Sequence, residues 1–348
     1  MHIVFLDNSI KFNGKSLNIK AIDSMQKNLI LFAESLAEKN YKVFVYNNTS
    51  KEELVSGVFW QNYERVRGKK IKCDILIVLQ DTDLIENSIN ASLKYFWLVK
   101  PILEKNHKNT VLNLMKAKYN ILFENYNIVD TLPHIYRFIS KFRLQAGVCK
   151  DFISVKHINF GISNAFVTSH PLRGLDWLID LWCNFIHNKV PWAELHIYSN
   201  LLNKNKLSKN VKISNLQLKI FSKKNAGICV KQPLPQNQFI KLLSNYRVHL
   251  NPILTETSQL TTLLESQASG IPVISRANNS IYDFIYDNET GYITNNHNKF
   301  AKKTIEILTN KSLFINLSNN SRLNTHIKLW SDIVLNFERN VNESSIYR

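Results

Sequence analysis

The stretch 251–276, NPILTETSQLTTLLESQASGIPVISR, constrains the fold of this chain more than any other. An apolar run at 248–250 leads into it and is typical of a buried strand. Residues 258–269 have the apolar spacing of a helix, which Gly270 ends in a left-handed turn. Residues 271–275 then form a second buried strand. Strand, polar loop, helix and strand in this order predict a βαβ unit of a parallel sheet.

The polar loop and the start of this helix carry candidate binding chemistry. Thr257 and Ser258 can cap the helix, whose free N–H groups and positive dipole end attract a phosphate. Glu265 lies roughly 10 Å further along the helix axis, where a nucleotide diphosphate could place its ribose. Glu265 could instead be an ordinary exposed helix residue. Its apolar neighbours argue for a specific partner, because a carboxylate beside an apolar stripe usually has one.

This stretch resembles the nucleotide-sugar site of group 1 glycosyltransferases, the retaining family 4 enzymes of GT-B fold. The family pattern is Glu, seven residues, Glu, then Ala, a small residue, Gly, any residue, Pro and Val. The second half of the pattern is matched by Glu265, Ala268, Gly270, Pro272 and Val273. In the first half, Thr257 occupies the strict position of the first Glu and Glu256 stands one residue earlier. The resemblance implies that Glu265 holds the ribose hydroxyls and that Glu256 contacts the sugar.

A second part of the chain resembles the same family. A strand at 165–168, a loop and a helix at 175–187 include Arg173-Gly174-Leu175-Asp176. In the family a basic pair in this loop contacts the diphosphate, and here Arg173 and His170 stand at those places. A solvated loop arginine is the alternative, but a position between a strand end and a helix favours phosphate binding.

The N-terminal region also alternates, with a strand at 2–6, a loop at 7–20, a helix at 28–39 and a strand at 42–46. In the family a Gly-Gly loop precedes this helix and faces donor and acceptor. This sequence has Asp23-Ser24 there, and the missing glycines would prevent the same close backbone approach. On the acceptor side we expect the residues Asn13, Gly14 and Asp81.

A buried strand at 74–79 is followed by Asp81 and Asp83. An Asp-x-Asp after a strand is the divalent-metal site of the other glycosyltransferase class, GT-A. We favour instead that one of these aspartates caps a helix over 84–94.

The resemblance implies an α/β chain of GT-B fold, with two Rossmann-like domains that face a cleft and a last helix that crosses back to the first domain. We expect an acceptor domain at 1–150, a nucleotide-sugar domain at 151–325 and the returning helix at 326–348. A length of 348 residues suits two domains with their own cores.

The implied function is retaining transfer of a sugar from a nucleotide-sugar donor to a glycan or lipid-linked acceptor, as in cell-envelope polysaccharide synthesis. No cofactor and no metal are expected. The expected catalytic residues are Arg173 and Glu256. The expected donor-binding residues are Arg173, His170, Glu256, Thr257, Ser258, Thr261 and Glu265. Two alternatives remain: a metal-dependent GT-A enzyme that uses Asp81 and Asp83, and a GT-B scaffold that has lost catalysis and acts as a binding protein.

The net charge of +17 indicates an anionic partner. The one compact basic run, 65–72, has no interleaved aromatic residues and no nucleic-acid-binding motif, so we expect no nucleic acid and a patch that faces an anionic membrane. No apolar run approaches a membrane span, the first residues lack a signal-peptide pattern, and the four cysteines form no C-x-x-C motif. These features predict a cytoplasmic protein that can lie on the inner face of the membrane. The histidines show no metal-ligand spacing.

Overall fold

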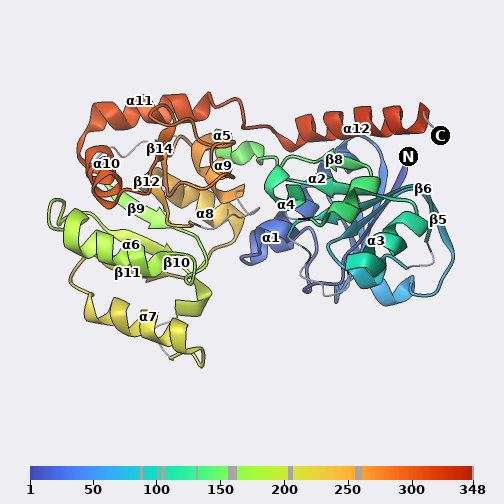
Figure 1. The fold of residues 1–348 in the computed structure, drawn as a ribbon, viewed down its shortest axis with the longest axis horizontal. Helices are drawn as coiled ribbons and strands as arrows, with labels where there is room; N and C mark the ends of the chain where they lie inside the picture. The colour runs from blue at the N-terminus through green and yellow to red at the C-terminus, as the bar shows by residue number, and fades with distance from the viewer. Residues whose placement is uncertain are drawn as a thin grey trace. The chain divides into compact units, whose positions relative to one another are not determined.

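The structure is a computed structural model, and it describes residues 1–86, 89–100, 102, 107–130, 132–155, 163–202, 207–254 and 261–346. The chain forms two compact units (Figure 1). Within the described residues, unit 1 comprises 1–147 and 328–346, and unit 2 comprises 148–254 and 261–327. Unit 2 is therefore inserted between two parts of unit 1.

Unit 1 contains an eight-stranded sheet whose neighbours are parallel except for β3 and β4. In sheet order the strands are β3 (Glu53–Val55), β4 (Val58–Asn62), β2 (Lys42–Asn47), β1 (His2–Leu6), β5 (Ile71–Leu79), β6 (Ile89–Leu98), β7 (Tyr119–Phe123) and β8 (Lys141–Arg143). The helices are α1 (Ser16–Ile19), α2 (Ser24–Glu38), α3 (His107–Lys116), α4 (Tyr126–Asp130) and α12 (Trp330–Ile346), with short turns η1 (Tyr63–Arg65), η2 (Thr82–Leu84) and η3 (His134–Phe138).

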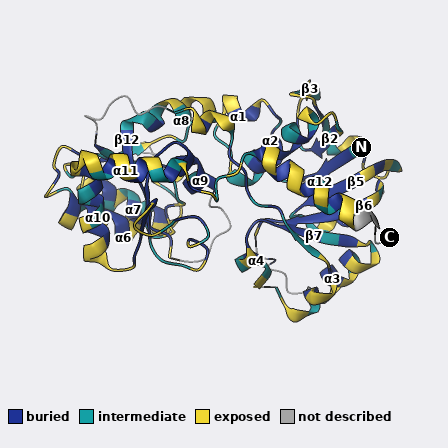
Figure 2. Cartoon of the chain, turned by 90° about the horizontal axis from the view of Figure 1, so that it is seen from above, coloured by how far each residue is buried: buried dark blue, intermediate teal, exposed yellow. Residues whose placement is uncertain are grey.

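Helix α12 packs on α2 over one face of this sheet. Phe32 of α2 lies at the centre, with ring centroids 5.8 Å from Phe5, 5.7 Å from Trp97 and 5.2 Å from Phe337 of α12. Trp330, the first residue of α12, is buried against the same Phe32. Along α12, buried and exposed residues alternate at helical spacing, as Figure 2 shows. The last helix of the chain is therefore part of the core of unit 1.

The helix predicted over 84–94 is wrong. That stretch contains the turn η2 and the first half of β6, which pairs in parallel with β5 from Ile71↔Ile89 to Leu79↔Trp97. Side chains from Ile89 to Trp97 face one side at every second position, which is the period of a strand. Pairing with β5 decides the structure of this segment, because tertiary context overrides weak helix propensity. The loop predicted over 7–20 also contains a short helix, α1.

Unit 2 contains a six-stranded sheet in which all strands are parallel. In sheet order they are β11 (Ile228–Lys231), β10 (Leu195–Tyr198), β9 (Asn164–Val167), β12 (Tyr246–Asn251), β13 (Val273–Ser275) and β14 (Gly291–Ile293). The helices are α5 (Lys150–Ile153), α6 (Leu175–Leu181), α7 (Val211–Ser222), α8 (Gln236–Leu242), α9 (Thr261–Ala268), α10 (His297–Thr309) and α11 (Lys311–Arg322), with shorter turns η4 (Trp182–Ile186), η5 (Asn200–Leu202) and η6 (Leu243–Asn245).

The order of these strands creates a switch point between β9 and β12. From β9 the chain adds β10 and β11 on one side, and it then adds β12, β13 and β14 on the other. In open α/β sheets, ligands bind beyond the carboxyl ends of the strands at such a point. The same rule places a switch point between β1 and β5 in unit 1. The loops after these four strands are therefore the first places to look for a site.

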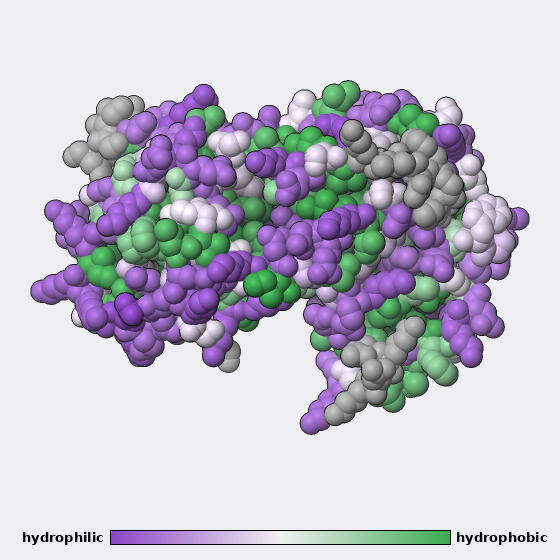
Figure 3. Space-filling view, turned by 180° about the vertical axis from the view of Figure 1, so that it is seen from behind, coloured by the Kyte–Doolittle hydropathy of each residue, from purple (hydrophilic) through white to green (hydrophobic). Residues whose placement is uncertain are grey.

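The chain has a mostly hydrophilic surface on the face drawn in Figure 3, with hydrophobic residues in smaller areas. None of the helices among the described residues combines the length and the apolar character that crossing a bilayer requires.

Candidate functional site

At the switch point of unit 2, the loop after β9 meets the loop after β12. Gly174, which precedes α6, has a φ of 89°, in the left-handed region. A Cβ atom at this glycine would lie 2.2 Å from the carbonyl oxygen of Pro252, closer than any real contact. Only glycine fits here, for both reasons. The two loops are thus held in backbone contact at the position that the strand order singles out.

The basic residues predicted for this loop lie next to that contact. His170 and Arg173 form the ends of a turn in which the Arg173 N–H donates to the His170 carbonyl at 2.9 Å. The Leu172 N–H donates to His170 Nδ1 at 3.2 Å. Burial lowers the pKa of His170, and the nearby charge of Arg173 lowers this pKa further. Both side chains are exposed, so an anion can reach them from solvent.

A buried histidine on β12, His249, links the residue after β9 to helix α9. Its Nδ1 lies 2.8 Å from Ser266 Oγ, and its Nε2 lies 3.2 Å from Thr168 Oγ1. The Ser266 hydroxyl donates its own proton to the Thr262 carbonyl, so Nδ1 donates to Ser266 and Nε2 is left as an acceptor. The Thr168 hydroxyl faces both Nε2 and Thr262 Oγ1, the latter at 3.3 Å, and its one proton serves one of these two acceptors. Burial lowers the pKa of His249 to about 3, which leaves a neutral imidazole.

Helix α9 brings the predicted donor-side residues Thr261 and Glu265 into the interior. Thr261 begins the helix and is 1% exposed, and Glu265 is 2% exposed. Glu265 is therefore not an exposed helix residue, as its apolar neighbours already indicated. Its charge is close enough to Cys149 to raise the pKa of that thiol, although burial is the larger cause. The predicted residues Glu256, Thr257 and Ser258 lie outside the described residues.

Sequence reasoning missed an arginine at the end of β13. The guanidinium carbon of Arg276 lies 4.6 Å from the centroid of the Trp177 ring, and Trp177 Nε1 donates to His297 Nε2 at 2.8 Å. Burial lowers the pKa of Arg276. Within the described part of the chain, Arg276 Nε and the Ser169 hydroxyl after β9 are buried without a hydrogen-bond partner. Its position directly after the predicted strand 271–275 could have marked Arg276 as a candidate, because ligands bind beyond the carboxyl ends of such strands.

The three residues predicted for the acceptor side each have contacts within unit 1. Asn13 Nδ2 donates to Glu53 Oε1 at 2.8 Å. A Cβ atom on Gly14 would lie 2.9 Å from Val55 Cγ1, so this glycine is enclosed. Asp81 accepts the N–H of Asp83 at 3.0 Å and caps η2, so an aspartate does cap the next turn, although that turn is not the predicted helix.

Buried carboxyl groups follow two strands of unit 1, and sequence reasoning missed both. Asp7 follows β1, is 1% exposed and accepts from the Ser9 hydroxyl at 2.8 Å. Burial raises the pKa of Asp7 to about 6, with a smaller contribution from the charge of Asp81 and against the effect of the Ser9 hydrogen bonds. Glu124 follows β7 and accepts from Asn28 Nδ2 at 2.9 Å. Burial raises the pKa of Glu124 to about 7.

The strands of unit 2, the contact between its two loops and the helix α9 all lie in a segment that matches a protein-family model. Residues 163–310 match the model of the family described as glycosyl transferases group 1. The resemblance to group 1 glycosyltransferases is confirmed. The matched segment includes Arg173, Gly174 and Glu265, three of the residues on which the sequence resemblance is based. No curated protein matches the chain in sequence.

Solved structures confirm the GT-B fold that the group 1 resemblance implies. A sucrose-phosphate synthase from Thermosynechococcus elongatus covers 100% of both chains at 10% identity, with a TM-score of 0.72. WaaG, a glycosyltransferase involved in lipopolysaccharide biosynthesis, covers 95% of both chains at 12% identity, with a TM-score of 0.63. Anabaena Alr3699/HepE in complex with UDP-glucose covers 100% of both chains at 10% identity, with a TM-score of 0.68. The family match and this fold support a glycosyltransferase and argue against the GT-A alternative.

Proposed function

We propose that this chain is a metal-independent, retaining glycosyltransferase that moves a sugar from a nucleotide-sugar donor to a glycan or lipid-linked acceptor. The observation that carries the proposal is the contact of Gly174 with Pro252. It fixes Arg173 at the switch point of a parallel sheet, where nucleotide ligands bind. The bound UDP-glucose in the structure of Alr3699/HepE supports a nucleotide-sugar donor for this fold.

The donor diphosphate would be held by positive groups of unit 2. Arg173 is exposed beside the loop contact and offers a guanidinium that pairs with two phosphate oxygens. The amino end of α9, whose first described residue is Thr261, favours an anion through the positive end of the helix dipole. Glu265, further along the same helix, would accept hydrogen bonds from the ribose hydroxyls. Glu256 is proposed to contact the transferred sugar.

The transfer itself needs charge stabilisation more than a separate base. The bond between the anomeric carbon and the diphosphate oxygen breaks while the acceptor oxygen bonds to that carbon on the same face. The acceptor proton goes to the departing phosphate oxygen. Negative charge grows on the diphosphate during this step, and preorganised donors such as Arg173 stabilise it.

A second candidate function is a GT-B protein that binds a ligand without catalysis. The observation that favours it is the absence of the family's glycines before α2. Asp23 stands there at the helix N-cap with an ordinary extended φ of −70°. A catalytically inactive protein would bind a nucleotide sugar without breaking it down.

The proposal is tested with a panel of nucleotide sugars, each incubated with the protein in excess EDTA. We expect one donor to be hydrolysed slowly without acceptor, and NMR of the released sugar or product should show retained anomeric configuration. Binding without turnover would instead support the second candidate. Activity that needs manganese and disappears in Asp81→Ala would contradict metal independence.

The contact that carries the proposal can be tested with two glycines. Gly174→Ala should abolish donor binding, because its new Cβ meets the Pro252 carbonyl. Gly68→Ala is the matched control, since Gly68 has a φ of 73° but no atom within 4 Å of its Cβ position. Equal donor affinity in both variants would remove the loop contact from the argument.

We also propose that the basic run 65–72 brings the protein to an anionic membrane that carries the acceptor. Arg65 and Arg67 pair with Glu52 at 2.7 Å and Glu64 at 3.2 Å, which reduces but does not cancel the positive charge of the run. Each basic residue near such a surface contributes about 1 kcal/mol, screened by salt.

Co-sedimentation with anionic vesicles should decrease as salt rises. It should also decrease when Arg67, Lys69, Lys70 and Lys72 become Ser. The control replaces four exposed lysines of unit 2, namely Lys209, Lys212, Lys223 and Lys224. Loss of binding in the control alone would place the membrane face elsewhere.

A further inference from the structure

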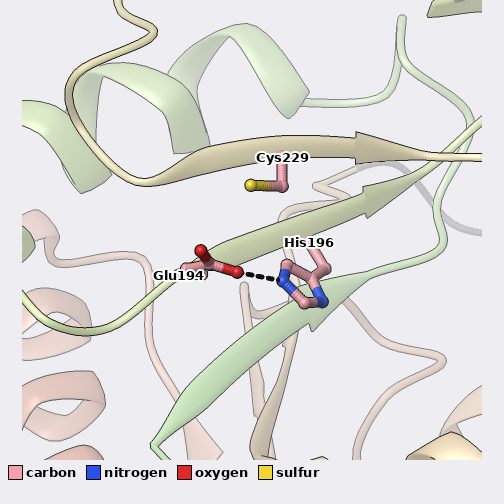
Figure 4. Close-up of side chains that lie close together, drawn as sticks. All are labelled: Glu194, His196 and Cys229. Carbon is pink, nitrogen blue, oxygen red and sulfur yellow. Dashed lines mark hydrogen bonds and ion pairs between the residues drawn. The ribbon is translucent and has the colours of Figure 1, made fainter.

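Three metal-ligating side chains meet on one face of the sheet of unit 2. Glu194 immediately precedes β10, His196 lies on β10, and Cys229 lies on β11. Glu194 and His196 are two residues apart on an extended chain and share a face, and His196 pairs in register with Cys229. One ligand atom of each side chain lies within 4.8 Å of the other two (Figure 4). Strand pairing thus gathers a carboxylate, an imidazole and a thiol.

His196 has one hydrogen-bond partner at each ring nitrogen. Its Nδ1 lies 2.7 Å from the hydroxyl of buried Tyr246, and that hydroxyl lies 2.7 Å from the hydroxyl of Tyr198. An oxygen partner at one ring nitrogen is the usual arrangement of a metal-binding histidine, because it fixes the ring and its tautomer. The other nitrogen, Nε2, faces Glu194 Oε2 at 2.6 Å.

At 2.6 Å the two atoms share a hydrogen bond, in which the Nε2 N–H donates to the carboxylate. The ring is neutral in this arrangement, because the Tyr246 hydroxyl can donate to Nδ1. A divalent metal can replace the proton at Nε2 when the ring proton lies on Nδ1 and donates to Tyr246 instead. Zinc lies about 2.0–2.2 Å from such ligand atoms, so the Glu194 carboxylate must move slightly away from Nε2 to admit the ion. The same ion can also bind the Cys229 sulfur.

We propose that Glu194, His196 and Cys229 bind one zinc ion, with a water molecule in the fourth position. Carboxylate oxygen, imidazole nitrogen and thiolate sulfur are the ligands that zinc takes in proteins. Binding displaces the thiol proton of Cys229 to solvent, and the two negative ligands balance the charge of the ion. Lys231 opposes binding by its charge. The Glu194 side chain is 47% exposed, so the ion can enter from solvent.

The ion would join the edge strand β11 to β10 and so stabilise unit 2. The proposal is independent of sugar transfer, because Glu194 lies before the amino end of its strand while the proposed donor residues follow the carboxyl ends. Its tests therefore use metal binding and stability.

The first test titrates metal-free protein with cobalt(II), which takes zinc ligands and gives an absorption band when a thiolate binds it. We expect one cobalt per chain with a thiolate band, which zinc then displaces. Cys229→Ser should lose the band and bind zinc at least about 100-fold more weakly, in line with the cost of disturbing a metal's surroundings. Cys183→Ser, at another half-buried cysteine of unit 2, should behave as wild type.

The second test is thermal unfolding with and without zinc chloride. Zinc should raise the melting temperature of wild type and Cys183→Ser but not of Cys229→Ser, because an ion that binds only the folded state stabilises it. Should Cys229→Ser not fold, Glu194→Ala gives the same comparison from the exposed ligand. No thiolate band in wild type, or zinc affinity unchanged in both Cys229→Ser and Glu194→Ala, would overturn the proposal.

Discussion

The two switch points of this molecule share a topology and differ in electrostatics. In unit 1 the strand β1 is followed by Asp7, a buried carboxyl whose pKa is raised to about 6. In unit 2 Thr168 follows β9 and His249 lies on the neighbouring strand β12, and burial lowers the pKa of this imidazole to about 3. In each case burial favours the neutral form of the group, because a charge is costly to desolvate.

The difference teaches which unit suits which substrate. Under the proposed function, a diphosphate would be repelled by the carboxyl groups after β1 and β5, whereas the second switch point carries the exposed Arg173 and a buried imidazole without charge. An acceptor hydroxyl is uncharged and tolerates the acidic surroundings. The difference also gives the two units opposite responses to pH, which makes the comparison testable.

The largest expected effect is the loss of stability of unit 2 in acid. The unfolded chain protonates His249 at about 6.5, whereas the folded chain does so only at about 3. The neutral ring therefore contributes its full share to the free energy of unfolding above pH 6.5. This share, up to about 5 kcal/mol, is lost as pH falls toward 3. Hydrogen exchange of peptides from β9 and β12 should speed up at pH 4 relative to pH 7, after correction for intrinsic rates. His249→Gln should flatten this response, and an unchanged profile would contradict the burial of a neutral ring.

The next effect concerns catalysis at the same switch point. Arg173→Ala should lower kcat by about 10²–10³-fold, which is the loss typical of one preorganised donor to a developing charge. Arg137→Ala, at an exposed arginine of unit 1, is the control and should leave kcat unchanged. Steady-state kinetics with the donor varied gives the answer. Wild-type turnover in Arg173→Ala would show that other groups stabilise the negative charge that develops on the leaving diphosphate.

Unit 1 should show the opposite pH response at Asp7. The unfolded chain loses this proton at about 3.8 and the folded chain at about 6. The stability contributed by the neutral acid is complete below pH 3.8 and is lost as pH rises through 6, by up to about 3 kcal/mol. Asp7→Asn should therefore unfold at higher urea than wild type at pH 8 and match it at pH 4. Asp83→Asn, at an exposed aspartate, should show no such difference. If Asp7→Asn is less stable to urea than wild type at pH 8, the hydrogen bonds from Ser9 stabilise the folded state by more than the buried charge destabilises it.

The smallest effect is on donor affinity. Glu265→Gln should raise the donor KM by roughly 10–100-fold with little change in kcat, because a charged hydrogen bond to a hydroxyl gives about 1.5–3 kcal/mol and the ribose barely changes in the reaction. Glu265 is 2% exposed, so a melting curve must accompany the kinetics. If Glu265→Gln unfolds unit 2, the carboxylate has a structural role and the ribose assignment fails.

The sequence predicted the alternating elements of unit 2 because its buried strands are short apolar runs bounded by polar loops. It failed at 84–94, where side chains at every second position from Ile89 to Trp97 carried the strand signal. The segment between the end of β5 at Leu79 and the start of β6 at Ile89 is too short for the predicted helix. Pairing with β5 is a long-range interaction, and local spacing does not contain it.

The site was predictable where a motif spans consecutive residues, and not where the fold gathers distant ones. Arg173 and Glu265 were found from local patterns. His249 reads as one polar residue in an apolar strand, and its partner Thr168 is 81 residues away. Glu194 and His196 alternate along one strand, but only the register with β11 adds Cys229.

The interleaved chain order of the two units has a consequence for biosynthesis. Helix α12 covers Phe32 and Tyr95 of unit 1, yet it follows all of unit 2 in the chain. Translation of the residues between 147 and 328 takes roughly 10–40 s, and domains fold as units while synthesis continues. Unit 2 can therefore finish folding on the ribosome while the first sheet still lacks its last helix. The part of the protein that is made first is the part that is completed last.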